Sequence, residues 1–325
     1  LFGNFYITMN NNYRSFVCGI KGKHLSDKEK KFLIKYKPWG IILFSRNIKS
    51  IKQTQLLTSS IKKILKNPYL PILIDEEGGR VSRLRKFIDN SVFSANYFGK
   101  LYLKDKKKFS LYYDVYIKQI SYLLRLLGIN INTVPVLDVL SKNTSSVIGN
   151  RSFSNNPEIV KILGQICIDE YNSKKMGSVI KHIPGHGCAT EDSHLKLPKV
   201  SKSYKDLKKS DFLPFKIRKT FFAMTAHILY KNLDKKNPAT TSKKIINTII
   251  RGKIGFKGML ISDDISMKAL NNDLITNAKK SLLAGCNLVL YCAGKYKDNS
   301  KLLKEVPFID KFTEKKTSEF YKFLR

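Results

Sequence analysis

The sequence predicts an α/β fold in which a single (β/α)8 barrel of the TIM type spans residues 1–325 as one domain. Three observations predict it: eight short apolar runs, spacers long enough for helices, and a polar residue at the end of most runs. A chain of this length with 42% apolar residues can bury one large core. The runs, interpreted as buried parallel strands, cover residues 16–20, 40–44, 70–75, 131–138, 178–182, 222–227, 259–264 and 288–292.

Helix signals lie in the spacers between these runs. The clearest helix begins at Asn156, an N-cap residue, has Pro157 at its first position, and is expected to end at Gly177. Strands and helices therefore alternate, which is typical of a parallel sheet with crossover helices. An open doubly wound sheet has similar strands and stays an alternative, although it would gather its site at one switch point.

Polar or charged residues stand where most of the apolar runs stop. In a (β/α)8 barrel, the C-terminal strand ends and their loops build the active site, so one barrel with one site explains this pattern. No glycine-rich loop for a dinucleotide or a nucleoside triphosphate opens a predicted helix, and we expect no cofactor. The strand-end residues are Arg46, Asn47, Asp75, Asp138, Lys181, His182, His227, Asp263 and Asp264.

The chain is strongly basic, with 60 Lys and Arg against 25 Asp and Glu and a net charge of +35. Fifty of these cations are Lys and ten are Arg, whereas phosphate and base recognition favours the planar fork of Arg. We interpret the charge as compositional drift and expect no nucleic-acid partner. A polyanion-binding protein stays open, and a steep loss of binding with salt would indicate it.

Five cysteines are scattered without the spacing of a metal or redox motif, which favours a reducing compartment. No run reaches the ~18 apolar residues of a membrane span. The first residues, LFGNFYITMNNNYRSF, lack the basic stretch and apolar run of an export signal. We therefore expect a cytoplasmic protein without membrane contact.

The densest group of reactive side chains lies in segment 181–194, KHIPGHGCATEDSH, which holds three of the five histidines. Its glycines and proline predict an irregular loop after His182. One alternative is a zinc site, but the spacing is not that of a helical HExxH motif, and we expect no metal. We favour a pair in which Asp192 orients His194 and stabilises its protonated form, so that His194 can transfer a proton. The possible zinc ligands are His182, His186, Asp192 and His194.

Two carboxylates, Asp263 and Asp264, end the run MLISDD. Because side chains alternate along a strand, one of the two faces the barrel axis. A carboxylate at a strand end can attack an anomeric carbon and form a glycosyl-enzyme intermediate. For Asp264 we expect a structural role, as a helix N-cap or in a salt bridge.

The segment LIDEEGGRVSRL, residues 73–84, is too polar for a core. Carboxylates accept hydrogen bonds from sugar hydroxyls, and Arg supplies a directed fork. Taken alone, a surface ion-pair network explains the segment equally well. The donors and acceptors suited to a small polar ligand are Asp75, Glu76, Glu77, Arg80 and Arg83, extended by Arg151, Lys181 and His182.

Together these motifs resemble the bacterial β-N-acetylhexosaminidases of glycoside hydrolase family three, the single-barrel cytoplasmic type used in cell-wall recycling. The match covers about residues 40–292, in order and with natural spacings. One such motif would be weak, whereas nine in register are specific. The motifs are GIILFSRN, DEEGGRVSR, NTVPVLDV, IGNRSF, KHIPGHG, EDSH, DFLPF, MTAH and GFKGMLISDDISM.

The resemblance implies a role for individual residues. Asp263 would be the nucleophile, His194 the proton donor and acceptor, and Asp192 the residue that orients His194. The residues implied to hold the terminal N-acetylglucosamine are Asp75, Arg83, Arg151, Lys181 and His182.

The implied activity is retaining exo-hydrolysis, which releases N-acetylglucosamine from the non-reducing ends of peptidoglycan fragments that carry anhydro-N-acetylmuramic acid. The partner would be this small glycan, and we expect a monomer. Two alternatives stay open: a phosphorylase of the same fold, in which phosphate replaces water, and a catalytically decayed sugar-binding protein.

Two departures from the family pattern lie near the eighth strand. Asn287 stands where an aspartate is expected, and Ala293 where an asparagine often follows the cysteine. They put the contacts of that strand in doubt, not the catalytic pair.

Overall fold

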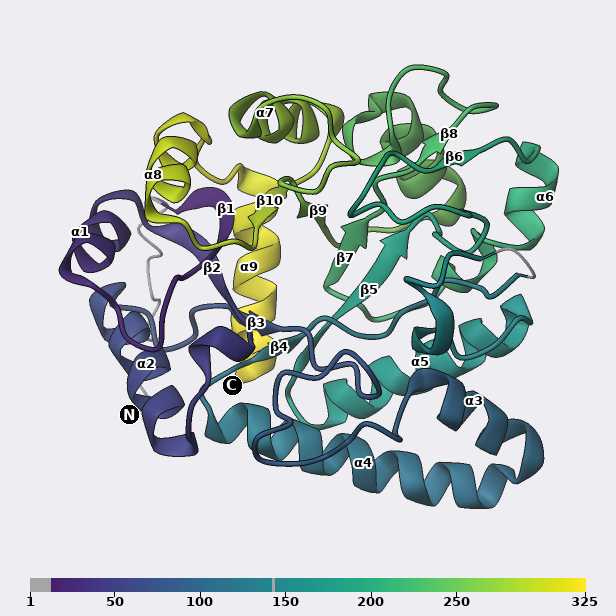
Figure 1. Cartoon of the computed structure of the whole chain (residues 1–325), viewed down its shortest axis with the longest axis horizontal. Coiled ribbons are helices and arrows are strands. Elements are labelled where there is room, and N and C mark those ends of the chain that lie inside the picture. Colours follow the sequence, from purple (N-terminus) through teal and green to yellow (C-terminus); the bar gives the residue numbers. More distant parts are fainter. Residues whose placement is uncertain (1–12, 142–143) are drawn as a thin grey trace, which may run out of the picture.

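A closed barrel of eight parallel strands forms the centre of the computed structural model, which describes residues 13–141 and 144–325 (Figure 1). The strand order is β1-β10-β9-β7-β5-β4-β3-β2. The predicted (β/α)8 barrel is confirmed, each predicted run overlaps one barrel strand, and the open sheet is excluded. The strands are β1 (Arg14–Gly19), β2 (Pro38–Leu43), β3 (Ile72–Ile74), β4 (Ile131–Asn132), β5 (Gly177–Ile183), β7 (Phe222–Thr225), β9 (Met259–Asp264) and β10 (Leu288–Tyr291).

Helices surround the barrel, and a two-stranded parallel sheet of β6 (Lys199–Val200) and β8 (Leu229–Tyr230) lies among its loops. Short 3-10 turns occur at η1 (Ser45–Asn47), η2 (Gly149–Arg151), η3 (Leu213–Phe215) and η4 (Ala239–Thr241). The helices are α1 (Asp27–Tyr36), α2 (Ile51–Ile64), α3 (Ala95–Lys104), α4 (Lys106–Leu126), α5 (Pro157–Ser173), α6 (Tyr204–Lys209), the π-helix η5 (Ile245–Ile254), α7 (Leu274–Ala284), α8 (Tyr296–Glu305) and α9 (Lys311–Leu324).

Helix α5 begins as the sequence predicts, since the Asn156 side chain accepts a hydrogen bond from the Glu158 N–H at 2.9 Å. The expected end at Gly177 is wrong. The helix stops at Ser173, and Gly177 is the first residue of β5. A Cβ at Gly177 would lie 2.8 Å from the Phe320 ring and 3.0 Å from Ile131, so the glycine is required by close packing and not by a helix end.

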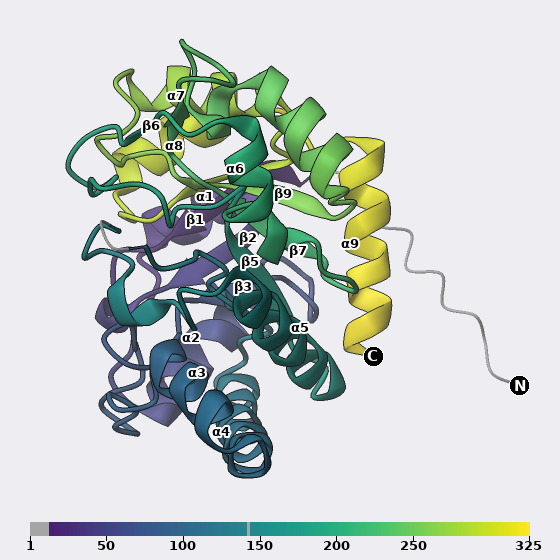
Figure 2. The same ribbon diagram turned by 90° about the vertical axis from the view of Figure 1, so that its right-hand side faces the viewer.

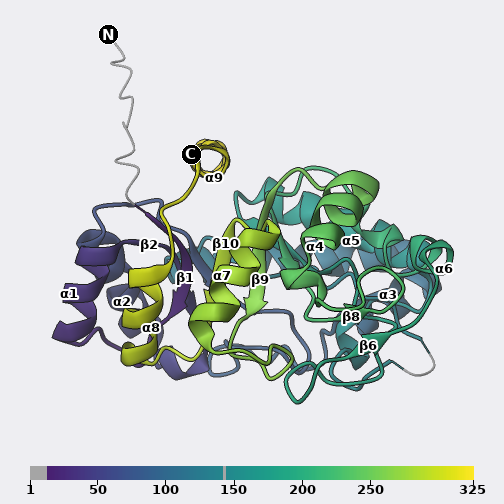
Figure 3. The same cartoon turned by 90° about the horizontal axis from the view of Figure 1, so that it is seen from above.

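The barrel interior is filled by side chains that alternate along the strands, and α9 closes its N-terminal end. Phe320 and Tyr321 of α9 belong to the interior cluster, and the indole N–H of Trp39 donates to Thr317 Oγ1 at 2.8 Å. Figures 2 and 3 show α9 across one end of the barrel, opposite the loops that carry β6 and β8. The strand residues of this cluster include Val17, Leu73, Ile131, Val179, Phe222, Met224, Ile261 and Leu290.

The inward-facing rows change from apolar to polar at the C-terminal end of the strands. Leu73 is followed two residues later by Asp75, and Val179 by Lys181, and both polar side chains line the cavity described below. Because residues i and i+2 share a face of a strand, the rows that fill the core also deliver polar groups to its upper surface. The site is therefore a continuation of the core.

The doubt about the eighth strand is resolved by the contacts of Asn287. Its Oδ1 accepts hydrogen bonds from the Leu260 N–H and from Arg251 Nη2, each at 2.9 Å. Its Nδ2 donates to Thr313 Oγ1 at 3.3 Å, a bond that ties the start of β10 to α9. The neutral amide thus makes the contacts that hold β9, β10 and α9 together.

No helix in the described residues combines the length and apolar character needed to cross a membrane. Residues 1–12, which hold most of the segment on which the expectation about export rests, lie outside the described part of the chain.

We expect Phe320→Ala to lower the free energy of unfolding by about 3–5 kcal/mol, because it removes a fully buried ring from the floor of the barrel and leaves a cavity. Phe312→Ala on the same helix is the matched control, since Phe312 is 40% exposed, and it should cost less than about 1 kcal/mol. Urea unfolding followed by fluorescence measures both. Equal losses would contradict the role of α9 as the barrel floor.

Candidate active site

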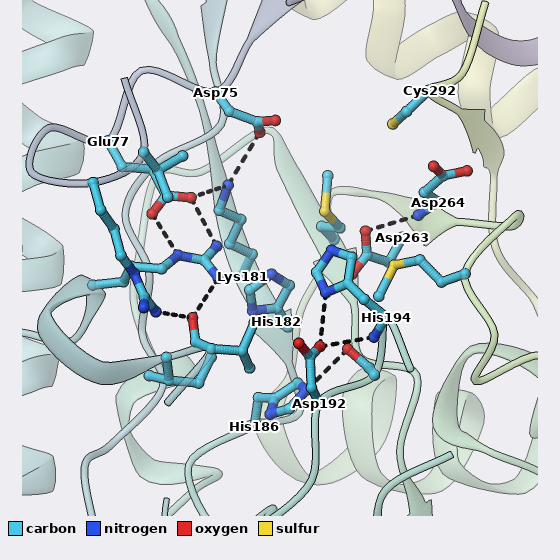
Figure 4. A pocket seen from close by; sticks show the side chains of 18 of the residues that line it. Asp75, Glu77, Lys181, His182, His186, Asp192, His194, Asp263, Asp264 and Cys292 are labelled. Atoms are coloured by element: carbon cyan, nitrogen blue, oxygen red, sulfur yellow. Dashed lines mark hydrogen bonds and ion pairs between the residues drawn. The ribbon is translucent and has the colours of Figure 1, made fainter. Parts of the chain in front are cut away.

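A cavity of about 490 Å³ opens at the C-terminal end of the barrel (Figure 4). All eight residues that the sequence analysis assigned to the site line this cavity. The rest of the lining combines charged groups with apolar side chains. The lining residues are Phe44, Asp75, Glu77, Arg80, Val81, Arg83, Ser146, Val147, Ile148, Arg151, Lys181, His182, His186, Asp192, Ser193, His194, Met224, Asp263, Asp264, Met267, Leu290 and Cys292.

Five charged side chains form a cluster of ion pairs in one wall of this cavity. Lys181 Nζ lies 3.2 Å from Asp75 Oδ1 and 2.7 Å from Glu77 Oε1. Arg151 binds Glu77 through two hydrogen bonds of 2.8 Å each, and Arg83 Nη2 lies 3.1 Å from Asp75 Oδ2. The side chains of Lys181 and Glu77 are 3% and 5% exposed. The two carboxylates therefore fix three cations in a largely buried arrangement.

The cations of this ion-pair cluster keep its two carboxylates ionised. Burial raises the pKa of Asp75, but Lys181 and Arg83 outweigh it and hold that pKa well below its usual range. Burial likewise raises the pKa of Glu77, and Arg151 and Lys181 bring it down to about 2. Both carboxylates are thus ionised at neutral pH.

Glu77 is the member of this cluster to which the resemblance assigned no role, although its sequence segment placed it among the groups suited to a small polar ligand. It stands two residues after Asp75, and both side chains point into the same group of cations. The spacing was a usable signal, because residues i and i+2 of an extended segment share a face.

His182 is oriented by a buried carboxylate. Its Nδ1 lies 2.7 Å from Asp138 Oδ2, while Asp138 Oδ1 accepts hydrogen bonds from the backbone N–H of His182 at 3.2 Å and of His186 at 2.7 Å. With Nδ1 occupied, Nε2 is the nitrogen of His182 available to the cavity. Asp138 was noted as a strand-end residue without a role, since its partners lie more than 40 positions away in sequence.

The loop after β5 carries the pair that the sequence predicts. His194 Nδ1 lies 2.8 Å from Asp192 Oδ1, which also accepts a hydrogen bond from the His194 N–H at 2.8 Å. The His194 side chain is 60% exposed, so its ring stands at the mouth of the cavity. No described residue forms a hydrogen bond with its Nε2, which can therefore reach a bound ligand.

His186 packs beneath this loop. Its Nε2 lies 3.3 Å from Ser193 Oγ, and burial lowers its pKa to about 4. This neutral imidazole supports the loop from below. In residues 13–141 and 144–325, no three His, Cys, Asp or Glu side chains are grouped as ligands for a metal ion.

Asp263 ends β9 and faces the cavity. Burial raises its pKa, but His182 and His227 more than reverse this effect, so the pKa lies below its usual value. Its Oδ1 also accepts a hydrogen bond from the Asp264 N–H at 2.7 Å. An ionised carboxylate is therefore held in the wall opposite the ion-pair cluster in the view of Figure 4.

The neighbouring Asp264 has a structural contact, although not the helix cap or salt bridge that was expected. Its Oδ1 accepts hydrogen bonds from the Ser266 N–H at 3.0 Å and the Ser266 Oγ–H at 2.8 Å, which closes the turn after β9. Its carbonyl oxygen lies 3.0 Å from Nε2 of His227, whose Nδ1 lies 2.7 Å from Thr240 Oγ1. These contacts fix the backbone that presents Asp263.

Comparison with known proteins confirms the resemblance. The model of the "Glycosyl hydrolase family 3 N terminal domain" matches residues 14–316. A curated β-hexosaminidase of Alkalilimnicola ehrlichii is 35% identical over 282 residues, which cover 85% of this chain and 80% of that protein. The structure of NagZ from Neisseria gonorrhoeae in complex with N-trifluoroacetyl-D-glucosamine aligns with a TM-score of 0.81 and 31% identity, over 97% of this chain and 90% of that one.

A second solved structure, the family 3 β-N-acetylglucosaminidase of Paenibacillus sp. str. FPU-7, aligns with a TM-score of 0.82 and 28% identity. The alignment covers 98% of this chain, which spans 62% of that protein. The barrel, the cavity and these relatives agree, and the chain belongs to glycoside hydrolase family 3 as a β-N-acetylhexosaminidase.

Proposed function

We propose that the protein is a retaining exo-β-N-acetylglucosaminidase that releases N-acetylglucosamine from the non-reducing ends of peptidoglycan fragments in cell-wall recycling. One observation carries the proposal: the ionised Asp263 and the Asp192–His194 pair lie in the wall of a single cavity. A nucleophile and a proton-transfer group are the two parts that a retaining glycosidase needs.

In the first step, a carboxylate oxygen of Asp263 attacks the anomeric carbon and the bond to the leaving oxygen breaks. His194, protonated on Nε2 and oriented by Asp192, gives its proton to that oxygen. In the second step, neutral His194 takes a proton from water, whose oxygen replaces Asp263 at the anomeric carbon. Because the histidine stands on an exposed loop, a small loop movement brings it to the bond.

The ion-pair cluster and His182 supply the sugar-binding groups of this proposal. Asp75, Arg83, Arg151, Lys181 and His182 would bind the terminal N-acetylglucosamine. The ion pairs within the cluster and the bond of His182 to Asp138 fix these groups before the sugar arrives, so binding requires little reorganisation.

The shape of the cavity supports exo action. Its floor includes Met224 and Leu290, which belong to the apolar interior of the barrel. A cavity that ends on the barrel core suits the terminal sugar of a glycan chain.

We place the reaction in the cytoplasm and assign it to a monomer. The five cysteines, all within the described residues, are free thiols, which suits a reducing compartment.

Purified wild-type protein should release N-acetylglucosamine from an aryl β-N-acetylglucosaminide without added metal, and Asp263→Ala should not, because the covalent step has no nucleophile. Running both with and without phosphate identifies the product. A sugar 1-phosphate would move the protein to the phosphorylases, and no turnover by folded wild type would indicate a decayed, sugar-binding protein.

His194→Ala should lose about 10² to 10⁴ in kcat on a natural disaccharide, because a poor leaving group needs the proton. The loss should be much smaller on an aryl glycoside with an activated leaving group. His24→Ala, which removes an exposed histidine that does not line the cavity, is the matched control. Equal losses on the two substrates would overturn the role of His194 in proton transfer.

A depressed carboxyl pKa keeps Asp263 ionised as the pH falls. With an activated aryl substrate, the acid limb of kcat/KM should therefore lie at or below about pH 4. Burial lowers the pKa of His227, which lowers the pKa of Asp263 when it is itself protonated at acid pH. In His227→Gln the acid limb should therefore move to higher pH. A pH–rate profile measures the shift, with thermal unfolding as the check on folding. An acid limb at the same pH in both proteins would contradict the electrostatic effect of His227 on Asp263.

A further inference from the structure

We propose that Arg80 recognises a carboxylate on the leaving group, so that the enzyme selects an anionic aglycone. The inference rests on the proposed function and deepens it, because it names the chemistry that the mouth of the cavity prefers. The evidence is that Arg80 is the one cation lining the cavity that forms no ion pair with a described residue.

Four Arg and Lys side chains line the cavity, and three of them form ion pairs with carboxylates of the site. Arg83 is paired with Asp75, Arg151 with Glu77, and Lys181 with both carboxylates. These three hold the buried wall of the site together. Arg80 has no ion pair with any described residue, and its side chain is exposed.

The guanidinium of Arg80 is nevertheless fixed in place. Its Nη2 donates to the carbonyl oxygen of Ser146 at 2.6 Å and also to that of Val147. The guanidinium plane of Arg80 lies next to Gly149, where an added Cβ would come within 3.6 Å of Arg80 Nη2. One nitrogen is thus occupied, while the N–H groups on Nε and Nη1 have no acceptor in the described residues. A guanidinium held in this way is a preorganised donor for a carboxylate.

The location of Arg80 points to the leaving group and not to the terminal sugar. The buried cluster of Asp75, Glu77 and Lys181 occupies the depth of the cavity, whereas Arg80 and His194 are both exposed at its mouth. Arg151 and Glu77 of the ion-pair cluster and Asp192 of the loop all act electrostatically on Arg80, which forms an ion pair with none of them. Since His194 would stand at the leaving oxygen, a sugar beyond the cleaved bond would leave the cavity through the mouth, where Arg80 is also exposed.

Two parts of a peptidoglycan fragment carry a carboxylate: the lactyl group of a muramic acid without peptide, and the peptide itself. Either would supply the same chemistry to Arg80. The pairing lies near solvent, so salt should weaken it.

The test compares kcat/KM for matched substrates. One pair is N-acetylglucosaminyl-N-acetylmuramic acid and its lactyl carboxamide; the other is the same disaccharide bearing a peptide with free or amidated carboxylates. Wild type should prefer the acid over the amide in at least one pair by about tenfold, and less so in high salt. Arg80→Gln should bring that ratio close to one, and Arg80→Lys, which lacks the fork, should give an intermediate ratio.

Arg85→Gln is the matched control, because Arg85 is an exposed arginine of the same segment that does not line the cavity. It should keep the wild-type ratio. The pair that shows the preference identifies the source of the carboxylate. Equal kcat/KM for acid and amide in both pairs, with turnover intact, would overturn the role of Arg80 and leave the proposed function standing. No turnover of any of the four substrates would overturn both.

Discussion

Side chains of a strand alternate between its two faces, and in a closed barrel of parallel strands every second residue must face the axis. This constraint fixes both the core and the site. The inward positions Leu73, Val179 and Ile261 fill the interior, and the next positions of the same rows, two residues on, are Asp75, Lys181 and Asp263. A barrel whose strands all point the same way therefore gathers these last positions at one end.

Gathering charged side chains at one buried end of the barrel costs desolvation free energy, and the ion-pair cluster shows how this cost is offset. Taking a carboxylate or an ammonium group out of water is unfavourable by several kcal/mol per ion unless good partners replace the water. Each carboxylate of the cluster has at least two cationic partners, and Lys181 bridges both carboxylates. Asp75 also accepts a hydrogen bond from Thr133 Oγ1. Removing one member leaves another charge buried without a partner, so the cluster acts as a unit.

Much of the fold and of the candidate site could be predicted because the signals are local. Each buried strand is a short apolar run, and the polar residue at its end stands beside it in sequence. The partnerships could not be predicted: Asp138 meets His182 across 44 positions, and Glu77 meets Arg151 across 74. Gly177 was misinterpreted for the same reason, since the Phe320 ring that demands a glycine there lies at the other end of the chain.

Closure of the barrel joins segments that are far apart in sequence. Strand β1 pairs with β10 through Phe16 and Val289, and the floor is completed by α9, which follows every strand. During synthesis, the first strand must wait for the last one before its edge is covered. The two walls of the cavity come from β3 and β5 on one side and from β9 on the other. The enzyme thus gains its catalytic arrangement in a late, long-range step of folding, and until then the nascent chain presents open strand edges.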